Sequence, residues 1–405
     1  MLLIVLAALS LTACHVDENK VEIQFSVVPK VAGALDFSLL TGTPVTFTEV
    51  RNQDSHTFEL DAFGRTAVVL TRGIYNISIE RRVTDAQGGD VVISLRMENV
   101  SVNADGQQIE GLVSSLPASA LGKDFIFSEI FFNGETNSGR MMHPDQYFVL
   151  FNPTEETLYA DGISVGVTMH LSWQNKQLWY DSYYPDRVPI GGFITLAGSG
   201  KDYPVAPGEK IVVAFTAIDH SAVEGYDHAV DLSGADFEIY FGPESNDVDN
   251  PAVPNVLITE NGDSYGFFFH PRGYVSPVLF RLKDGLQATV DEFVKNHTTL
   301  SKKEVPATET TPPGEIDIHV LAVNTDAILD GVQTSDVPQD VKTRVIPEVV
   351  DRGKFLVNGC HRQELCIRKA IPVGEKIFYK DTNNSEEDFE MKKGQNAFPV
   401  GWRKK

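Results

Sequence analysis

An acidic stretch, "ESNDVDNPAVPN", carries oxygen atoms that could bind a calcium ion. Asp247, Asp249 and Asn250 lie close together along it, as do the first ligands of a calcium-binding loop. The stretch lacks the glycine at the bend and the closing bidentate glutamate of a complete loop. A turn in which Asx side chains bond their own backbone is the alternative interpretation.

Two further stretches carry ligand types that transition metals accept. His220 and His228 lie in "DHSAVEGYDHAVDLSGAD" among several aspartates, and "GRMMHPDQY" brings Met141, Met142 and His143 together. Imidazole with carboxylate suits ions such as zinc or iron, and thioether with imidazole suits copper or haem iron. Ordinary polar loops between strands explain both stretches equally well. No cofactor is expected, and a calcium or transition-metal ion is the alternative.

The stretch "LSWQNKQLWYDSYYPDR" is unusually rich in aromatic residues, namely Trp173, Trp179, Tyr180, Tyr183 and Tyr184. Aromatic faces in an extracellular protein suit sugar or partner recognition, through stacking and through buried anchor residues. The alternative is that these rings close the open end of a β-sandwich core. Ligand recognition here is the leading hypothesis for a site.

The N-terminus predicts a lipid anchor. The apolar run from Leu2 to Leu9 is too short to span a bilayer, which takes roughly 20 apolar residues, and it is typical of a signal peptide. The following "LTAC" resembles the bacterial lipobox, which implies that residues 1–13 are removed and that Cys14 is lipidated. Residues 14–20 then form a tether, and its acidic residues are similar to the surface-export tag of Bacteroidota lipoproteins. The protein is therefore expected on the outer membrane, exposed at the cell surface.

The two other cysteines, Cys360 and Cys366, flank "HRQEL". Because the cell envelope is oxidising, a disulfide between them is the default expectation. Zinc sites usually show closer paired spacing and more ligands, and redox pairs usually read Cys-x-x-Cys.

The net charge of −22 argues against nucleic-acid binding, which relies on Lys and Arg to neutralise phosphates. Sequence signatures of the common hydrolase, nucleotide-binding and zinc-protease sites are missing. A non-enzymatic binding protein is therefore expected. A structural or adhesive surface protein and a hydrolase with its site in the insertions described below are the alternatives.

Short segments rich in β-branched and aromatic residues, separated by turn signals, predict an all-β fold. We expect two immunoglobulin-like β-sandwich domains, the second enlarged by insertions. In residues 21–113, the stretch "DAFGRTAVVLTRGIYNISIE" resembles the transthyretin-like, carboxypeptidase-regulatory-like module, with Asp61 and Gly64 in a turn. Residues 114–123 are expected to be a linker.

Residues 124–405 carry several motifs that resemble a lamin-tail-like domain. They are "FIFSEIFFNG", "DQYFVLFNPTEETLYADGISV", "YPVAPGEKIVVAF", "AILDGV" and "CIRKA" followed by "KDTNNSEEDFE". Insertions are expected at about 170–190 and 247–313, where a specific function could lie. Within the second, "LQATVDEFVKNH" shows the helical spacing of apolar residues.

The whole arrangement resembles a Bacteroidota surface lipoprotein family, domain of unknown function 4876. The resemblance implies fold and location and assigns no activity. The expected function is to bind a ligand or partner at the surface, and an accessory role beside a TonB-dependent outer-membrane importer is the expected context.

Overall fold

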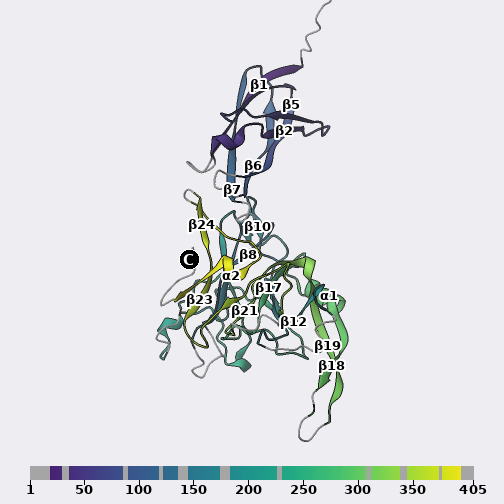
Figure 1. The fold of residues 1–405 in the computed structure, drawn as a ribbon, viewed down its shortest axis with the longest axis vertical. Helices are drawn as coiled ribbons and strands as arrows, with labels where there is room; N and C mark the ends of the chain where they lie inside the picture. The colour runs from purple at the N-terminus through teal and green to yellow at the C-terminus, as the bar shows by residue number, and fades with distance from the viewer. Residues whose placement is uncertain are drawn as a thin grey trace, which may run out of the picture. The chain divides into compact units, whose positions relative to one another are not determined.

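The computed structural model describes residues 19–29, 36–84, 90–117, 122–135, 145–173, 183–225, 230–305, 307, 312–337, 344–373 and 376–393. Strands dominate this part of the chain, which confirms the all-β prediction (Figure 1). Two compact units are present. We call them the N-terminal unit, Met1–Ala118 with Val373–Glu375, and the C-terminal unit, Ser119–Pro372 with Lys376–Lys405.

The N-terminal unit holds one seven-stranded sheet in the order β3-β2-β5-β6-β7-β1-β4. Apolar residues alternate along its strands, as in β1 where Val21, Ile23, Phe25 and Val27 are buried, and they meet in one core. Its elements are β1 Lys20–Pro29, η1 Phe37–Leu40, β2 Pro44–Glu49, β3 Ser55–Glu59, β4 Arg65–Thr71, β5 Gly73–Thr84, β6 Asp90–Val102 and β7 Gln107–Pro117. Strand β7 thus continues into residues 114–117, which the sequence analysis assigned to the linker.

The predicted turn between β3 and β4 is confirmed. The Asp61 side chain accepts hydrogen bonds from the backbone N–H of Phe63 at 2.8 Å and of Arg65 at 2.9 Å. Gly64 follows with a φ of +71°, a conformation that favours glycine because it has no Cβ.

The C-terminal unit is built on two larger sheets. A seven-stranded sheet has the order β18-β19-β12-β11-β17-β20, with β16 pairing to β12, and a six-stranded sheet has the order β15-β14-β9-β8-β23-β26. Side chains from both sheets, among them Phe148 and Val213 from one and Val165 and Leu279 from the other, pack into a single core. Strands covered on both faces read as continuous apolar runs, as in β9 "YFVLF".

The strands of the seven-stranded sheet are β11 Ile163–Thr168, β12 Arg187–Thr195, β16 Leu257–Glu260, β17 Pro277–Arg281, β18 Thr298–Val305, β19 Gly314–Asn324 and β20 Ile328–Gly331. Those of the six-stranded sheet are β8 Ile126–Asn133, β9 Tyr147–Phe151, β14 Lys210–Ala214, β15 Phe237–Glu238, β23 Glu364–Arg368 and β26 Phe389–Lys393. The segment expected as an insertion at 247–313 therefore supplies three sheet strands, because its apolar runs complete the sheet.

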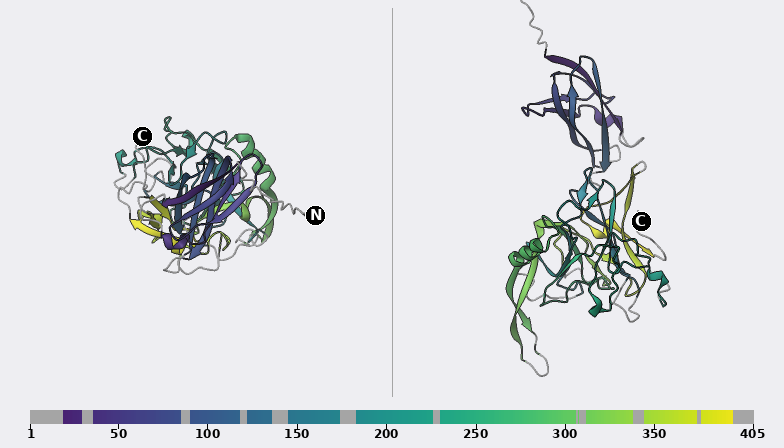
Figure 2. Two further views of the ribbon diagram at one scale, coloured as in Figure 1. Left: turned by 90° about the horizontal axis from the view of Figure 1, so that it is seen from above. Right: turned by 180° about the vertical axis from the view of Figure 1, so that it is seen from behind.

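The remaining elements are short, apart from one helix. They are β10 Leu158–Tyr159, β13 Pro204–Val205, η4 His220–Ala222, η5 Pro243–Ser245, α1 Gln287–His297, η6 Thr325–Ala327, β21 Thr334–Ser335, β22 Phe355–Leu356, β24 Ala370–Val373, β25 Lys376–Tyr379 and α2 Ser385–Asp388. Helix α1 confirms the predicted helical segment, with Val290 buried and Phe293 packed against Phe193 and Phe280 of the sheet. After it, β18 and β19 form a long hairpin (Figure 2).

A buried charge network joins three motifs that the sequence analysis singled out. The Arg368 guanidinium lies 2.6 Å from the Asp330 carboxylate and 3.0 Å from that of Asp381, and the Asp388 carboxylate is 3.9 Å away. Arg368 also donates to the backbone carbonyl of Phe127 at 2.7 Å. Because both Arg368 and Asp330 are buried, these contacts hold β23 to β8 and β20 through charges that water does not screen.

Candidate functional site

A row of aromatic side chains on the C-terminal unit is the candidate functional site. We call it the aromatic platform, and it consists of Trp173, Tyr274, His270, Phe268 and Tyr265. Consecutive ring centroids are 6.1, 4.5, 6.2 and 6.5 Å apart. Trp173 and Tyr265 at the two ends are 46% and 68% exposed. Since proteins usually cover large rings, this row offers apolar faces to a partner.

Alternation along the stretch "FFFH" explains why part of the platform faces outward. Phe267 and Phe269 are buried in the core of the C-terminal unit, whereas Phe268 and His270 between and after them stay partly exposed. The backbone is also held from below, because the Gln146 side chain donates to the carbonyl of Phe269 at 2.9 Å. The platform therefore rests on a segment that is anchored on both sides of each outward ring.

A tight turn reverses the chain between His270 and Tyr274. The N–H of Gly273 donates to the carbonyl of His270 at 2.7 Å, and the Asn133 side chain donates to the carbonyl of Pro271 at 2.6 Å. Gly273 has a φ of +70°, and a Cβ there would lie 3.0 Å from the Thr334 side chain. Glycine is therefore required for both conformation and space.

Trp173 reaches this turn from a distant part of the sequence. The N–H of the preceding residue, Ser172, donates to the carbonyl of Tyr274 at 2.7 Å. The buried Ser172 hydroxyl donates to the carbonyl of Thr334 at 2.8 Å. These bonds bring the two expected insertions, at 170–190 and 247–313, together at one surface.

An ion pair lies beside the rings. Arg272 and Asp336 are 2.5 Å apart, and their side chains are 45% and 8% exposed. Burial raises the pKa of the Tyr274 hydroxyl, and the nearby Asp336 carboxylate raises that pKa further. Asp336, which follows directly after β21, therefore lies close to both Arg272 and Tyr274.

The imidazole of His270 is neutral at pH 7. Burial lowers its pKa from the ordinary value, and the Arg272 charge lowers the pKa further. Its Nδ1 accepts a hydrogen bond from the N–H of Arg272 at 3.1 Å, so the proton of the neutral ring is on Nε2. The platform therefore presents a hydrogen-bond donor here and no added charge.

The predicted disulfide is wrong, because Cys360 and Cys366 are both free thiols. Cys366 lies in β23, where its side chain is buried in the core between the sheets. Cys360 lies on the loop before that strand and is partly exposed. Burial raises the pKa of both thiols, which disfavours the thiolate that a nucleophile needs.

The other predicted aromatic residues have different surroundings. Tyr183 is buried, with its hydroxyl 3.0 Å from the Thr299 hydroxyl and the Arg187 guanidinium 4.8 Å from its ring centroid. Tyr184 is partly exposed, and Trp179 and Tyr180 lie outside the described residues. Of the three predicted rings that the structure describes, Trp173 lies in the platform, and Tyr183 has the core position of the alternative interpretation.

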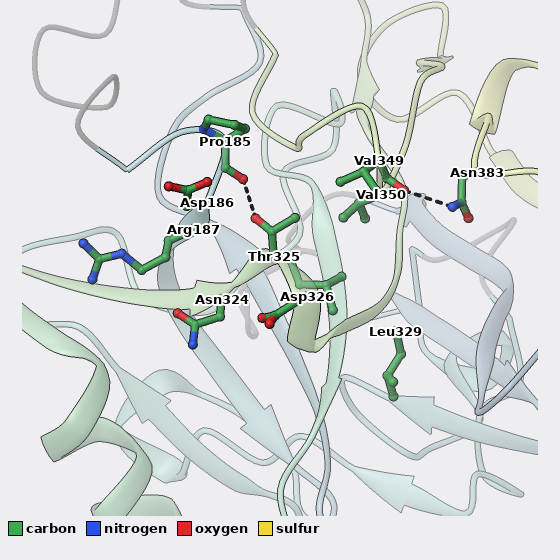
Figure 3. Close-up of a pocket in the computed structure, with 11 residues that line it drawn as sticks. Pro185, Asp186, Arg187, Asn324, Thr325, Asp326, Leu329, Val349, Val350 and Asn383 are labelled. Carbon is green, nitrogen blue, oxygen red and sulfur yellow. Dashed lines mark hydrogen bonds between the residues drawn. The ribbon is translucent and has the colours of Figure 1, made fainter.

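The chain immediately after Tyr184 lines a pocket of about 770 Å³ (Figure 3). Some of the polar groups that line the pocket are hydrogen-bonded to one another. The Thr325 hydroxyl donates to the carbonyl of Pro185 at 2.6 Å, and the Asn383 side chain donates to the carbonyl of Val349 at 2.9 Å. What remains is a mixture of apolar walls such as Leu329 and scattered charges, without an aromatic surface.

The predicted metal ligands are engaged within the protein where the structure describes them. His220 is buried in η4 with Nε2 2.9 Å from the carbonyl of Thr216. His228 and the trio Met141, Met142 and His143 lie outside the described residues. Within the described part of the chain, no three His, Cys, Asp or Glu side chains are grouped so that they could hold a metal ion.

Asp247 and Asn250 form the backbone-bonded turn of the alternative interpretation. Asp247 accepts from the N–H of Phe241 at 2.9 Å and of Val248 at 2.8 Å, and Asn250 donates to the carbonyl of Ala217 at 2.7 Å. Asp249 accepts from the Asn255 side chain at 2.9 Å. Burial raises the pKa of Asp247.

The lipid-anchor residue Cys14 lies outside the described residues. Among the helices that the structure describes, none has the length and apolar character needed to span a bilayer.

The sequence could have indicated the rest of the platform. Three consecutive phenylalanines, a histidine and a tyrosine within "GFFFHPRGY" are a dense aromatic signal. What the sequence does not show is that Trp173 and Asp336 meet this segment, since they come from residues about 100 and 60 positions away.

Residues 206–396 match the model of a family of proteins of unknown function, DUF4876. No curated protein matches the chain. A solved DUF4876 family protein from Bacteroides thetaiotaomicron shares 19% identity, with 91% of this chain and 94% of that chain covered and a TM-score of 0.57. At this identity the likeness shows a shared fold.

Two other solved structures match with low TM-scores. A DUF3823 family protein from Parabacteroides merdae has 10% identity, coverage of 38% of this chain and 68% of that chain, and a TM-score of 0.15. A Bacteroides uniformis protein with a provisional carbohydrate-binding description has 11% identity, coverage of 75% and 98%, and a TM-score of 0.18. The family match is thus the more informative result: residues 206–396 of the chain are similar to the DUF4876 family of proteins of unknown function.

Proposed function

We propose that this protein is a non-catalytic surface protein that binds a ligand through its aromatic platform. The observation that carries the proposal is the exposure of Trp173 and Tyr265 at the two ends of a row whose middle segment is anchored by Gln146 and Asn133. Rigid, exposed rings with an adjacent ion pair are typical of recognition surfaces. Burial raises the pKa of the nearby Cys360 thiol, which disfavours the thiolate that a nucleophile needs.

The location is part of the same proposal. Lipid attached to Cys14 would tether the protein to the outer membrane, with the platform facing the cell exterior. The apolar leader and the lipobox-like "LTAC" support this. Replacing Cys14 by Ser should release the protein from washed membranes into the soluble fraction. Unchanged membrane fractionation would refute the anchor and leave ligand binding untouched.

An accessory role beside a TonB-dependent importer is the proposed context. A tethered protein that binds a ligand at the cell surface raises the local concentration of that ligand beside a neighbouring transporter. The support for this context is the expected address, and the test is a crosslinking experiment in intact cells. An outer-membrane β-barrel crosslinked to wild-type protein, and lost in the Cys14→Ser variant, is the expected result.

Ligand binding itself is tested on the full chain purified from its own envelope. Native mass spectrometry and elemental analysis of wild-type protein and of Trp173→Ala identify what stays bound. Phe63→Ala is the matched control, because Phe63 is an exposed ring, 71% accessible, in the N-terminal unit. We expect a ligand that Trp173→Ala loses and Phe63→Ala keeps. Equal retention by both variants would contradict a role for the platform.

A further inference from the structure

We infer that the aromatic platform binds a carbohydrate, with a pyranose ring stacked against Trp173 and Tyr274 and its hydroxyl groups bonded to Arg272, which Asp336 holds in place. This inference rests on the proposed function and names its class of ligand. It draws on three features of the platform, which are its ring faces, its balanced charge and its rigidity.

The ring faces suit a ligand with one apolar side. Trp173 and Tyr274 lie with centroids 6.1 Å apart and planes inclined at 51°, so they form a shallow angled surface. The face of an aromatic ring carries partial negative charge. A pyranose presents a face of C–H groups that carry partial positive charge, and it stacks on such a surface without needing a deep pocket.

The ion pair beside the rings suits a neutral ligand that accepts hydrogen bonds. The half-exposed Arg272 guanidinium offers donors, and the buried Asp336 carboxylate 2.5 Å away holds that guanidinium in place. Neighbouring sugar hydroxyls can accept hydrogen bonds from the guanidinium side by side, and hydrogen bonds to charged groups are the stronger ones.

Charge balance argues against the other small-ligand classes. An anion attracted by Arg272 meets the Asp336 carboxylate, and a cation attracted by Asp336 meets Arg272. The neutral His270 adds no charge to either side. The chain as a whole carries −22, which repels anions further. A neutral polyhydroxylated ligand avoids each of these penalties.

Rigidity lowers the entropic cost of binding. The N–H and the hydroxyl of Ser172, the residue before Trp173, both donate hydrogen bonds, and the turn between His270 and Tyr274 is bonded to Asn133. Little side-chain and loop freedom therefore remains to be lost when a ligand binds.

The test uses the full chain on an array of neutral pyranose oligosaccharides, namely glucans, mannans, galactans and xylans, followed by calorimetric titration with the bound hexasaccharide. Trp173→Ala and Asp336→Asn should each weaken affinity by roughly tenfold or more. Phe63→Ala should leave affinity within about twofold. If Asp336→Asn does not fold, the half-exposed Trp173→Ala variant still decides the question.

Three outcomes would overturn the inference. They are binding to none of the neutral glycans, glycan binding that Trp173→Ala leaves unchanged, and a Trp173-dependent ligand from the native envelope that is a protein or a metal. The third outcome would leave the proposed function standing while removing its carbohydrate assignment. If no ligand depends on Trp173 for binding, both the proposed function and the carbohydrate assignment are overturned.

Discussion

Replacing Arg368 by Met should strongly destabilise the C-terminal unit. The Arg368 and Asp330 side chains are only 2% and 5% exposed, so the change leaves a carboxylate buried without its cation. It also removes donors from the carbonyls of Phe127 and Lys380, at 2.7 and 3.1 Å. Removing one partner of a buried ion pair costs about 3–5 kcal/mol.

The hydrogen bonds that remain after the substitution determine where in this range the loss of stability lies. Asp330 keeps hydrogen bonds from the N–H groups of Phe127 and Gly331, both at 2.8 Å, which reduces the cost of its stranded charge. Each carbonyl that loses its donor adds about 1 kcal/mol or more. We therefore expect a loss of about 4 kcal/mol in the free energy of unfolding.

Tryptophan fluorescence during urea denaturation measures this loss of stability in the C-terminal unit specifically. The three tryptophans, Trp173, Trp179 and Trp402, all belong to the C-terminal unit. A loss of about 4 kcal/mol should lower the urea midpoint by roughly 1–2 M. The control is Lys302→Met, because Lys302 pairs with Asp317 on the surface, where the side chains are 66% and 56% exposed. It should change stability by no more than about 0.5 kcal/mol.

Two results would refute the reasoning. One is an Arg368→Met midpoint that matches that of Lys302→Met. The other comes from the double variant Arg368→Met with Asp330→Asn, which removes the stranded charge and should be more stable than the sum of the single losses predicts. Full additivity would mean that the ion pair does not explain the loss.

The remaining predictions concern a histidine, a turn and the thiols. Burial and the Lys303 charge lower the pKa of His170 to about 3, against about 6.5 in an unfolded chain. Only the unfolded state gains this proton as pH falls below 6.5, so by pH 5 the free energy of unfolding of the C-terminal unit should fall by about 2 kcal/mol. Urea denaturation at both pH values measures this loss, and the His170→Gln variant should not show it. Gly64→Ala should increase hydrogen exchange in β1 and β4 far more than Gly106→Ala does. The φ angle is near +70° at both glycines, but a Cβ at Gly64 would lie 2.6 Å from the Val27 side chain, whereas a Cβ at Gly106 would have no atom within 4 Å. Equal exchange in the two variants would exclude the steric cause. Alkylation of native protein followed by peptide mass spectrometry should label Cys360 and spare buried Cys366; a recovered disulfide peptide would contradict this.

Local patterns in the sequence determined most of the secondary structure. Period-two alternation in "VEIQFSVV" specifies a strand with one buried face, and the apolar spacing around Val290 specifies helix α1. Asp61 and Gly64 specify their turn through a side-chain hydrogen bond and a positive φ. Each of these depends on a few neighbouring residues, so the sequence alone was sufficient.

Tertiary structure decided the site. Trp173 meets Tyr274 and Asp336 lies beside Arg272 only because two sheets and their connecting turns bring these segments together. It likewise decided that Cys366 points into the core, away from any pairing with Cys360, although an oxidising envelope made a bond between them the default expectation. The physical reason is the same in both cases: which face of a strand a side chain occupies, and which distant segment covers that face, depend on the packing of the whole core and leave no mark in the local sequence.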